Sequence, residues 1–370
     1  MNDNILKMAG GAMPDSPERK SSMGKFSEEK RVVQAYFDAL ESCRIEDLKE
    51  TLKGFVSPDY HMRSVYPFRE IPDADTAVEK VWAPIRNTLT STQRRQDIFI
   101  AGDNMMRDGE VWVMSMGHFT GLFDNEWLGI RPTAKLASLR YVEFVCVKDG
   151  KIVQNCLHLD LIGLMQQAGA YPLPPSTAQY YVYPGPRRHN GLLYEDAPEE
   201  EGKATLALVS KMCDDLVDGG LVNDTGIEFS DEYAASVYAK TFSQNMYWYG
   251  PCGIGATYTI PRYITQHQGP FSAGLMDMKF VGHRVRFAEG NFACWFGWPN
   301  LSNKNSGGYL GMPVSAERAE MCVVDVYSCG DGKIEENWVF IDIPWWLKQQ
   351  GLDVFQRTST ILNPKKEQMT

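Results

Sequence analysis

The sequence predicts an α+β protein in which one fold occurs twice. Two observations indicate this: the chain repeats itself at an offset of 182 residues, and each copy begins with helical periodicity and ends with strand-like segments. Between Leu128–Gly169 and Leu310–Gly351, 13 of 42 aligned positions are identical. Because these identities accompany a matched apolar pattern, we interpret the chain as a tandem duplication.

The pattern of each copy predicts about three helices followed by an antiparallel meander of four strands. In the first copy, an apolar stripe that includes Tyr36 and Leu40 predicts the first helix. The dipeptide Asp149-Gly150 predicts the hairpin between the last two strands. The expected helices are 27–43, 45–54 and 75–90, and the expected strands are 96–103, 109–120, 136–148 and 151–160.

The second copy follows the same order. Asp331-Gly332 predicts its final hairpin at the position equivalent to Asp149-Gly150. The expected helices are 203–218, 230–242 and 259–268, and the expected strands are 277–287, 290–299, 317–329 and 333–342.

The segment between the copies, Ala170 to Glu201, contains six prolines and five tyrosines, so we expect an extended linker that packs against a domain. A tethered duplicate can bury its two open sheet faces against each other, which predicts a pseudo-dimer within one chain. The expected divisions are a disordered N-terminal segment at 1–25, a first domain at 26–169, a linker at 170–202, a second domain at 203–355 and a C-terminal tail at 356–370.

Composition narrows the function classes. The 37 basic and 47 acidic residues give a formal charge of −10, which disfavours nucleic acid as a partner. Met1 to Lys25 lacks an apolar signal core, and no window is apolar enough to span a bilayer, so we expect a cytoplasmic protein without membrane contact. The eight cysteines form no C-x-x-C pair, and phosphate-loop, dinucleotide, zinc-protease and serine-nucleophile motifs are missing. We therefore predict no metal and no cofactor.

Strand alternation separates the last strand of each copy into two faces. Gln154, Cys156, His158 and Asp160 share one face in the first copy. Glu336, Trp338, Phe340 and Asp342 share it in the second copy. We expect this face to line the cavity between sheet and helices, where burial would raise the pKa of each Asp toward the range useful for acid–base catalysis.

Each Asp has a simpler interpretation as well. Asp160 and Asp342 both precede a predicted helix, where an Asp can cap the backbone N–H groups of the first turn. His158 lies two residues from Asp160 on the same face, whereas Phe340 takes that place in the second copy. This difference favours the first cavity as the catalytic one, with Asp160 and His158 as the catalytic pair.

Other side chains are candidates for the walls of the two cavities. Aromatic walls suit a small hydrophobic or aromatic molecule, which is the partner we expect. The substrate-binding candidates are Tyr60, Tyr66, Trp82, Trp112, Met114 and His118 in the first copy, and Tyr247, Trp295, Trp338 and Asp342 in the second.

Several of these segments resemble a known family. Leu128-Gly129-Ile130-Arg131-Pro132-Thr133, the hairpin at Asp149-Gly150, and His158-Leu159-Asp160 followed by Gly163-Leu164-Met165-Gln166-Gln167 are similar to the C-terminal signature of SnoaL-like polyketide cyclases, in the nuclear transport factor two-like superfamily. The resemblance is good over 27–169 and weaker over 203–355. Ala134 and Cys156 depart from the family pattern, which has Gly and often Trp there.

The resemblance implies a cone-shaped fold in each copy, with a curved antiparallel sheet wrapped by about three helices. It also implies that Asp160 acts as general acid/base in an intramolecular aldol cyclisation without metal or cofactor. The same fold supports isomerases, dehydratases and non-catalytic modules, so fold does not fix function. Three hypotheses about function stay open. The protein is an enzyme (a cyclase, isomerase or lyase) acting in the first cavity, or a small-molecule binding protein, or an oligomerisation scaffold. The sequence does not decide whether the whole chain forms a homodimer.

Overall fold

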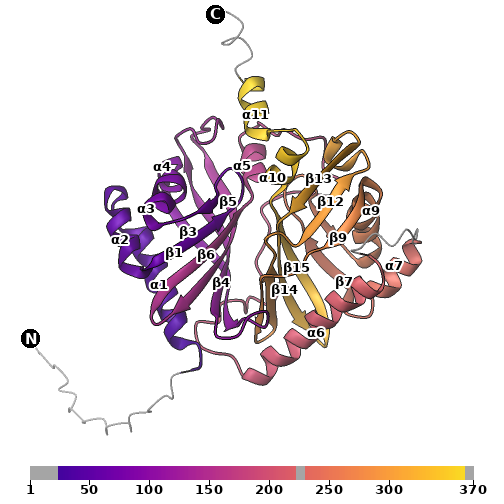
Figure 1. Cartoon of the computed structure of the whole chain (residues 1–370), viewed down its shortest axis with the longest axis horizontal. Helices are drawn as coiled ribbons and strands as arrows, with labels where there is room; N and C mark the ends of the chain where they lie inside the picture. The colour runs from indigo at the N-terminus through magenta and orange to yellow at the C-terminus, as the bar shows by residue number, and fades with distance from the viewer. Residues whose placement is uncertain (1–23, 222–229, 363–370) are drawn as a thin grey trace, which may run out of the picture.

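The computed structural model of the protein describes residues 24–221 and 230–362. Within these ranges the chain forms two halves, each built on a six-stranded sheet. In Figure 1 the two sheets face each other at the centre, with the helices α1 to α4 outside the first sheet and α6, α7 and α9 outside the second. Most of the expected N-terminal segment 1–25 lies outside the described residues, as does the end of the expected tail 356–370. Helix α11 (Val354–Leu362) occupies the start of that tail.

As predicted, helices precede the last four strands of the first half, but two strands that were not predicted, β1 and β2, lie between its second and third helices. The strand order is β2-β1-β6-β5-β4-β3, and β1 pairs with β6 in parallel. The sheet is therefore mixed, which corrects the expectation of a wholly antiparallel sheet. Its elements are α1 (Ser27–Ser42), α2 (Leu48–Phe55), β1 (Val56–Ser64), β2 (Arg69–Ile71), α3 (Ala74–Ala77), a π-helical turn (Val78–Trp82), α4 (Ala83–Thr88), β3 (Leu89–Asp103), β4 (Val111–Phe123), β5 (Leu136–Lys148), β6 (Lys151–Leu159) and α5 (Leu161–Gln167).

Local sequence explains the two elements that position this sheet. In α1, Val33, Tyr36 and Leu40 recur at helical spacing and are buried, so one face of the helix covers the sheet. Between β5 and β6, Asp149 and Gly150 both have positive φ, at 51° and 70°. Two such residues in succession form the tight turn whose twist matches an antiparallel hairpin.

The second half repeats this order, with strand order β10-β11-β14-β15-β7-β8 and β7 parallel to β15. The predicted helix 230–242 ends at Tyr238, and Phe242 already begins a strand. The elements are α6 (Glu199–Asp218), α7 (Asp231–Tyr238), β7 (Phe242–Tyr249), β8 (Ala256–Tyr258), α8 (Ile260–Tyr263), a π-helical turn (Ile264–Gln268), α9 (Gly269–Gly274), β9 (Leu275–Phe280), β10 (Val285–Glu289), β11 (Phe292–Phe296), β12 (Leu301–Asn305), β13 (Ser315–Met321), β14 (Val323–Gly330), β15 (Lys333–Ile341) and α10 (Ile343–Gln349).

The long strands of the first half are interrupted in the second. Strand β3 runs unbroken over 15 residues, whereas the predicted strand 277–287 divides into β9 and β10. The predicted strand 317–329 likewise divides into β13 and β14, and β9, β12 and β13 form a separate three-stranded sheet. Asn300 lies at the break, where its side chain accepts a hydrogen bond from the Val323 N–H at 2.9 Å. This side-chain bond takes the place of a ladder bond, so the strands bend apart there.

The two sheets pack against each other through a shared apolar core. This inter-sheet core contains Trp112, Met114, Phe144 and Cys156 from the first half, with their neighbours, and residues such as Phe287, Phe296, Trp338 and Phe340 from the second. Phe144 and Phe296 meet edge to face, with ring centroids 4.9 Å apart. The linker joins both edges, because Gly191 and Leu193 bond to Phe99 of β3 and Gln179 pairs with Ala256 of β8. Helix α6 begins at Glu199 rather than at 203.

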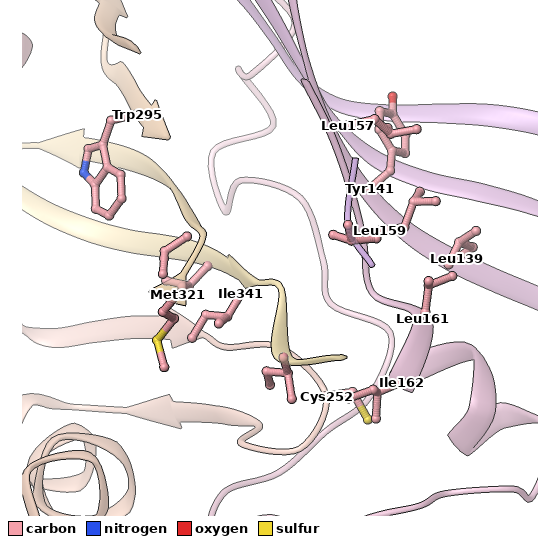
Figure 2. Close-up of a cluster of buried hydrophobic side chains, with 14 of the residues drawn as sticks. Leu139, Tyr141, Leu157, Leu159, Leu161, Ile162, Cys252, Trp295, Met321 and Ile341 are labelled. Atoms are coloured by element: carbon pink, nitrogen blue, oxygen red, sulfur yellow. The ribbon is translucent and has the colours of Figure 1, made fainter. Parts of the chain in front are cut away.

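The structure corrects the face assigned to the last strands. Cys156, Trp338 and Phe340 point into the inter-sheet core, whereas we expected that face to line the cavity under the helices. The opposite face, with Leu157 and Leu159 in β6, packs in the cluster that includes the helices. Figure 2 shows Leu157, Leu159 and Tyr141 on strands of the first half, and Met321, Ile341 and Trp295 on strands of the second. Both faces of β6 are apolar because both are covered, so alternation alone does not tell them apart.

Candidate functional site

Asp160 lies at the junction of the halves and caps helix α5. Its Oδ1 accepts the Gly163 N–H at 3.0 Å, and its Oδ2 accepts the Cys252 N–H of the second half at 2.9 Å. Figure 2 shows Cys252 beside Ile162 of that helix. Burial raises the pKa of Asp160, while the Arg140 charge and these two N–H groups oppose the shift. Both carboxyl oxygens are therefore engaged in structural hydrogen bonds.

Asp342 has the equivalent place in the second half. It caps α10 through the Trp345 N–H and also accepts the Tyr66 N–H of the first half. The Arg69 guanidinium pairs with it at 3.0 Å. Burial raises the pKa of Asp342 to about 6, and Arg69 opposes the shift. The predicted wall residue Asp342 is thus part of the contact between the halves.

His158 lies on the inter-sheet side of β6. Its ring meets Trp298 edge to face with centroids 5.9 Å apart, and its Nδ1 is 3.7 Å from the Cys156 Sγ. Its Nε2 is buried and has no hydrogen-bond partner within the described ranges. Burial lowers the pKa of His158 to about 3, so the ring is neutral at ordinary pH. Asp160 and His158 therefore have different contacts, and both lie outside the helix-side interior of the first half.

The interior of the first half is filled by a buried ion pair. Arg94 donates to the Glu143 Oε2 at 2.8 Å, and Glu143 Oε1 accepts from Tyr36 and Asn155. The Arg94 guanidinium stacks on aromatic rings, with the Phe37 centroid at 3.7 Å. The remaining cavity beside Arg94 has a volume of about 30 Å³, which is room for one or two water molecules.

The other first-half candidates lie in four different surroundings. Tyr60 and Trp82 are buried on the helix side, where neither the Tyr60 hydroxyl nor the Trp82 Nε1 has a partner among the described residues. Trp112 and Met114 belong to the inter-sheet core, and His118 lies 3.5 Å from Asp97. The Tyr66 hydroxyl donates to Asp353. The six first-half candidates therefore do not line one common cavity.

A cavity is present in the second half, between α6, α7, the π-helical turn and the helix side of the sheet. Its volume is about 140 Å³, close to that of an engineered apolar cavity of about 150 Å³ that holds benzene. Its walls carry many apolar and aromatic side chains, and several come from the strand break. Wall residues at or beside this break are Phe280, His283, Asn300, Leu301, Met321 and Val323.

Asp325 is the carboxyl group of this cavity. Its Oδ1 accepts hydrogen bonds from the Tyr327 hydroxyl at 3.0 Å and from the Asn337 amide at 2.9 Å. Both hydrogen bonds that Asp325 accepts within the described residues go to Oδ1, and none goes to Oδ2. Burial raises the pKa of Asp325 to about 7, and the two hydrogen bonds oppose the shift. A carboxyl in this state exchanges a proton near neutral pH.

Two imidazoles share the cavity wall with Asp325. His267 stacks on Trp248 with ring centroids 4.0 Å apart, and His283 stacks on Trp295 at the same distance. Burial lowers the pKa of each ring to about 3, so both are neutral. The His283 Nδ1 lies within hydrogen-bond distance of Arg286. A neutral imidazole carries one N–H, which can donate to a carbonyl oxygen.

Trp295 is the sequence candidate that lines this cavity. Trp338 and Tyr247 lie on the inter-sheet side, where Trp338 stacks on Tyr249 and Tyr249 on Tyr247. Asp325 was not predicted as a site residue from the sequence. A signal was present, because the repeat aligns Asp325 with Glu143 and Asn337 with Asn155, an acid and an amide on neighbouring strands of both halves.

No cluster of three or more His, Cys, Asp or Glu side chains in 24–221 and 230–362 is suited to hold a metal ion. Among the described helices, none is both long and apolar enough to cross a membrane.

Comparison with known proteins finds matches to a family model and to solved structures. The family model of SnoaL-like polyketide cyclases matches residues 30–168. Matching solved structures include a putative SnoaL-like polyketide cyclase from Jannaschia sp. CCS1, with 15% identity, 40% of this chain and 94% of that chain covered, and a TM-score of 0.31. IdmH, a putative polyketide cyclase from Streptomyces antibioticus, matches with 18% identity, 38% and 96% coverage, and a TM-score of 0.31. An NTF2-like protein from Burkholderia xenovorans LB400 matches with 9% identity, 40% and 97% coverage, and a TM-score of 0.31. A comparison with curated proteins found no match.

The family match falls on the half that carries the signature segments, and it confirms the resemblance drawn from them. The second half repeats the same order of helices and strands. Residues 30–168 match the family model of SnoaL-like polyketide cyclases, and the six-stranded sheet of the second half has the same strand order as that of the first.

Proposed function

We propose that the protein is a polyketide-cyclase-type acid–base enzyme whose reaction takes place in the second-half cavity, on a hydrophobic carbonyl compound. The observation that carries the proposal is Asp325, a buried carboxyl in an aromatic cavity with one oxygen unpartnered within the described residues. Its pKa of about 7 allows it both to accept and to return a proton near neutral pH.

The proposed reaction is an intramolecular aldol closure. Asp325 removes a proton from the carbon next to a carbonyl, and the electron pair moves onto the carbonyl oxygen to give an enolate. The enolate carbon then attacks a second carbonyl carbon of the same substrate, forming a C–C bond and leaving an alkoxide. The proton held by Asp325 passes to the alkoxide, so the carboxylate is regenerated and no external reactant is consumed.

The neighbours of Asp325 suit this role. Tyr327 and Asn337 hold Oδ1, which fixes the carboxyl plane and leaves Oδ2 for the substrate. Trp295 donates to the Tyr327 hydroxyl at 3.2 Å and so fixes the phenol in turn. The neutral ring of His267 supplies an N–H for the developing enolate oxygen, which is most effective in a site with little water.

The size and lining of the cavity limit the substrate. A volume of about 140 Å³ accepts one aromatic ring with a short side chain, and a longer substrate extends beyond it. Stacked ring pairs such as Trp248 with His267 favour a flat, apolar ring. We therefore propose aromatic ketones as the substrate class for this cavity.

The predicted catalytic role of Asp160 and His158 stays a prediction. Both oxygens of Asp160 accept backbone N–H groups, so proton transfer there would require breaking one of these bonds. The first half has its interior occupied by Arg94 and Glu143. These observations favour the second half as the place of the chemistry.

Exchange of α-protons tests the proposal without the natural substrate. Acetophenone is incubated in D2O with wild type, Asp325→Asn or Asp160→Asn, and loss of the methyl proton signal is followed by NMR. We expect wild-type exchange above buffer, a reduction of about 100-fold or more in Asp325→Asn, and little change in Asp160→Asn. Equal exchange in wild type and Asp325→Asn, or loss only in correctly folded Asp160→Asn, would refute it. Ketone binding without exchange would indicate a binding protein instead.

A further inference from the structure

Two arginines from different halves meet at the junction with one neutral acceptor between them. Arg63 lies in β1, and Arg284 directly precedes β10. The Arg63 Nη1 donates to the Gln154 Oε1 at 3.2 Å, and the Arg284 Nη2 donates to the same oxygen at 3.0 Å. One amide oxygen therefore holds two guanidinium groups close to each other.

The charges at this place do not balance. Glu70 lies 3.7 Å from the Arg63 Nε, but it also pairs with His61 and accepts from Trp298. Arg284 forms no ion pair with a described carboxylate within 4.0 Å. Arg69 is nearby in sequence, yet its charge is matched by Asp342. The site carries one guanidinium more than its carboxylates neutralise.

The pKa shifts of Arg284 and His61 reflect the same excess of positive charge. Burial and the Arg63 charge lower the pKa of Arg284, and the charge of Glu110, which itself pairs with Arg107, opposes that shift. Burial and the Arg63 charge also lower the pKa of His61, and Glu70 opposes that shift. In the described residues, the Nε atoms of Arg63 and Arg284 are buried without a hydrogen-bond partner. Unused N–H groups and like charges at short range both favour an added acceptor.

We propose that Arg63 and Arg284 form a binding site for a small oxyanion, the phosphate or carboxylate group of a ligand, at the junction of the two halves. Guanidinium groups match such oxyanions in charge and in hydrogen-bond geometry. Arg63 is 14% exposed, and Arg284 and Gln154 are also partly exposed, so an ion can approach from solvent. Bound there, the oxyanion bridges the two guanidiniums, with Gln154 turning aside, and ties the halves together.

The first experiment measures thermal stability against anion type. The full chain is heated in sodium phosphate, in sodium acetate, and in sodium chloride at matched ionic strength. We expect phosphate or acetate, or both, to raise Tm by about 2 °C over chloride at about twenty times Kd, and the arm that does so identifies the oxyanion. Isothermal titration with inorganic phosphate and with acetate gives Kd directly.

Three variants test whether the anion-dependent rise in Tm comes from the site at Arg63 and Arg284. Arg284→Gln should abolish the anion-dependent rise in Tm, while Arg318→Gln on β13 should keep it. Gln154→Glu places a carboxylate between the two guanidiniums, so we expect its Tm in chloride to exceed that of wild type and to respond no further to phosphate or acetate. Equal Tm values of the wild type in all three salts would show that no such site exists. So would a rise in Tm over chloride that is undiminished in Arg284→Gln and Gln154→Glu.

Discussion

Asp160 and Asp342 are equivalent residues of the two copies, and each accepts a backbone N–H group from the opposite half. Asp160 accepts from Cys252 at 2.9 Å, and Asp342 accepts from Tyr66 at 3.0 and 3.1 Å. Each also caps the helix that follows it. The duplication has therefore conserved a pair of acids whose geometry serves the contact between the halves, whatever else they do.

Because Asp160 also accepts an N–H group from the opposite half, we expect its loss to destabilise the protein more than the loss of an ordinary helix cap. Asp160→Ala removes the α5 cap and leaves the buried Cys252 N–H without an acceptor, so we expect a loss of about 2–4 kcal/mol in unfolding free energy. Asp73→Ala is the matched control, because Asp73 caps α3 through Thr76 at an exposed position. Its loss should be about 1 kcal/mol. Urea unfolding of both variants checks this, and equal losses would contradict a role across the junction.

The ion pair inside the first half predicts strong coupling. Arg94→Met leaves the Glu143 carboxylate buried without its cation, which we expect to cost about 3–5 kcal/mol. Adding Glu143→Gln removes the unpaired charge while an amide oxygen can still accept from Tyr36, so the double variant should recover most of the loss. A double-mutant cycle in urea measures the coupling. Additive losses would mean that the pair does not act as a unit.

The first-half and second-half interiors show what the sequence could and could not predict. The repeat, the stripe on α1 and the two Asp-Gly hairpins predicted helices and the later strands of each half, because these signals are local. The strands between the helices, β1 and β2 in the first half and β7 and β8 in the second, were not predicted. The covered face of β6 was assigned wrongly, since Cys156 and Leu157 are both buried and their alternation has no polar side. A cavity was expected in both halves, but the sequence did not predict that the second one would be the larger. This difference depends on a strand break at Asn300 and on Arg94 filling the other half, both of which are tertiary contacts.

Asp325 should limit stability when it ionises. Its pKa is about 7 in the folded protein and near 3.8 in an unfolded chain, so the folded state holds the proton more tightly. Stability contributed by the protonated form is therefore lost as pH rises from about 4 to about 7. Asp325→Asn keeps an acceptor for Tyr327 and Asn337 but cannot ionise. We expect it to be more stable than wild type by roughly 4 kcal/mol at pH 8 and nearly equal at pH 4, as measured by urea unfolding. A variant that is less stable at pH 8 would contradict the buried-charge account.

The same pKa predicts the pH profile of proton exchange. Because Asp325 accepts the proton as a carboxylate, the exchange rate of acetophenone should rise with pH, reach half its maximum near pH 7 and level off above about pH 8. Tyr327→Phe removes one hydrogen bond that stabilises the ionised form, so the midpoint should move to higher pH while Asp160→Asn leaves it unchanged. NMR rates from pH 5 to pH 9 determine all three midpoints. A midpoint near pH 4, or one that Tyr327→Phe leaves in place, would assign the exchange to a carboxyl other than Asp325.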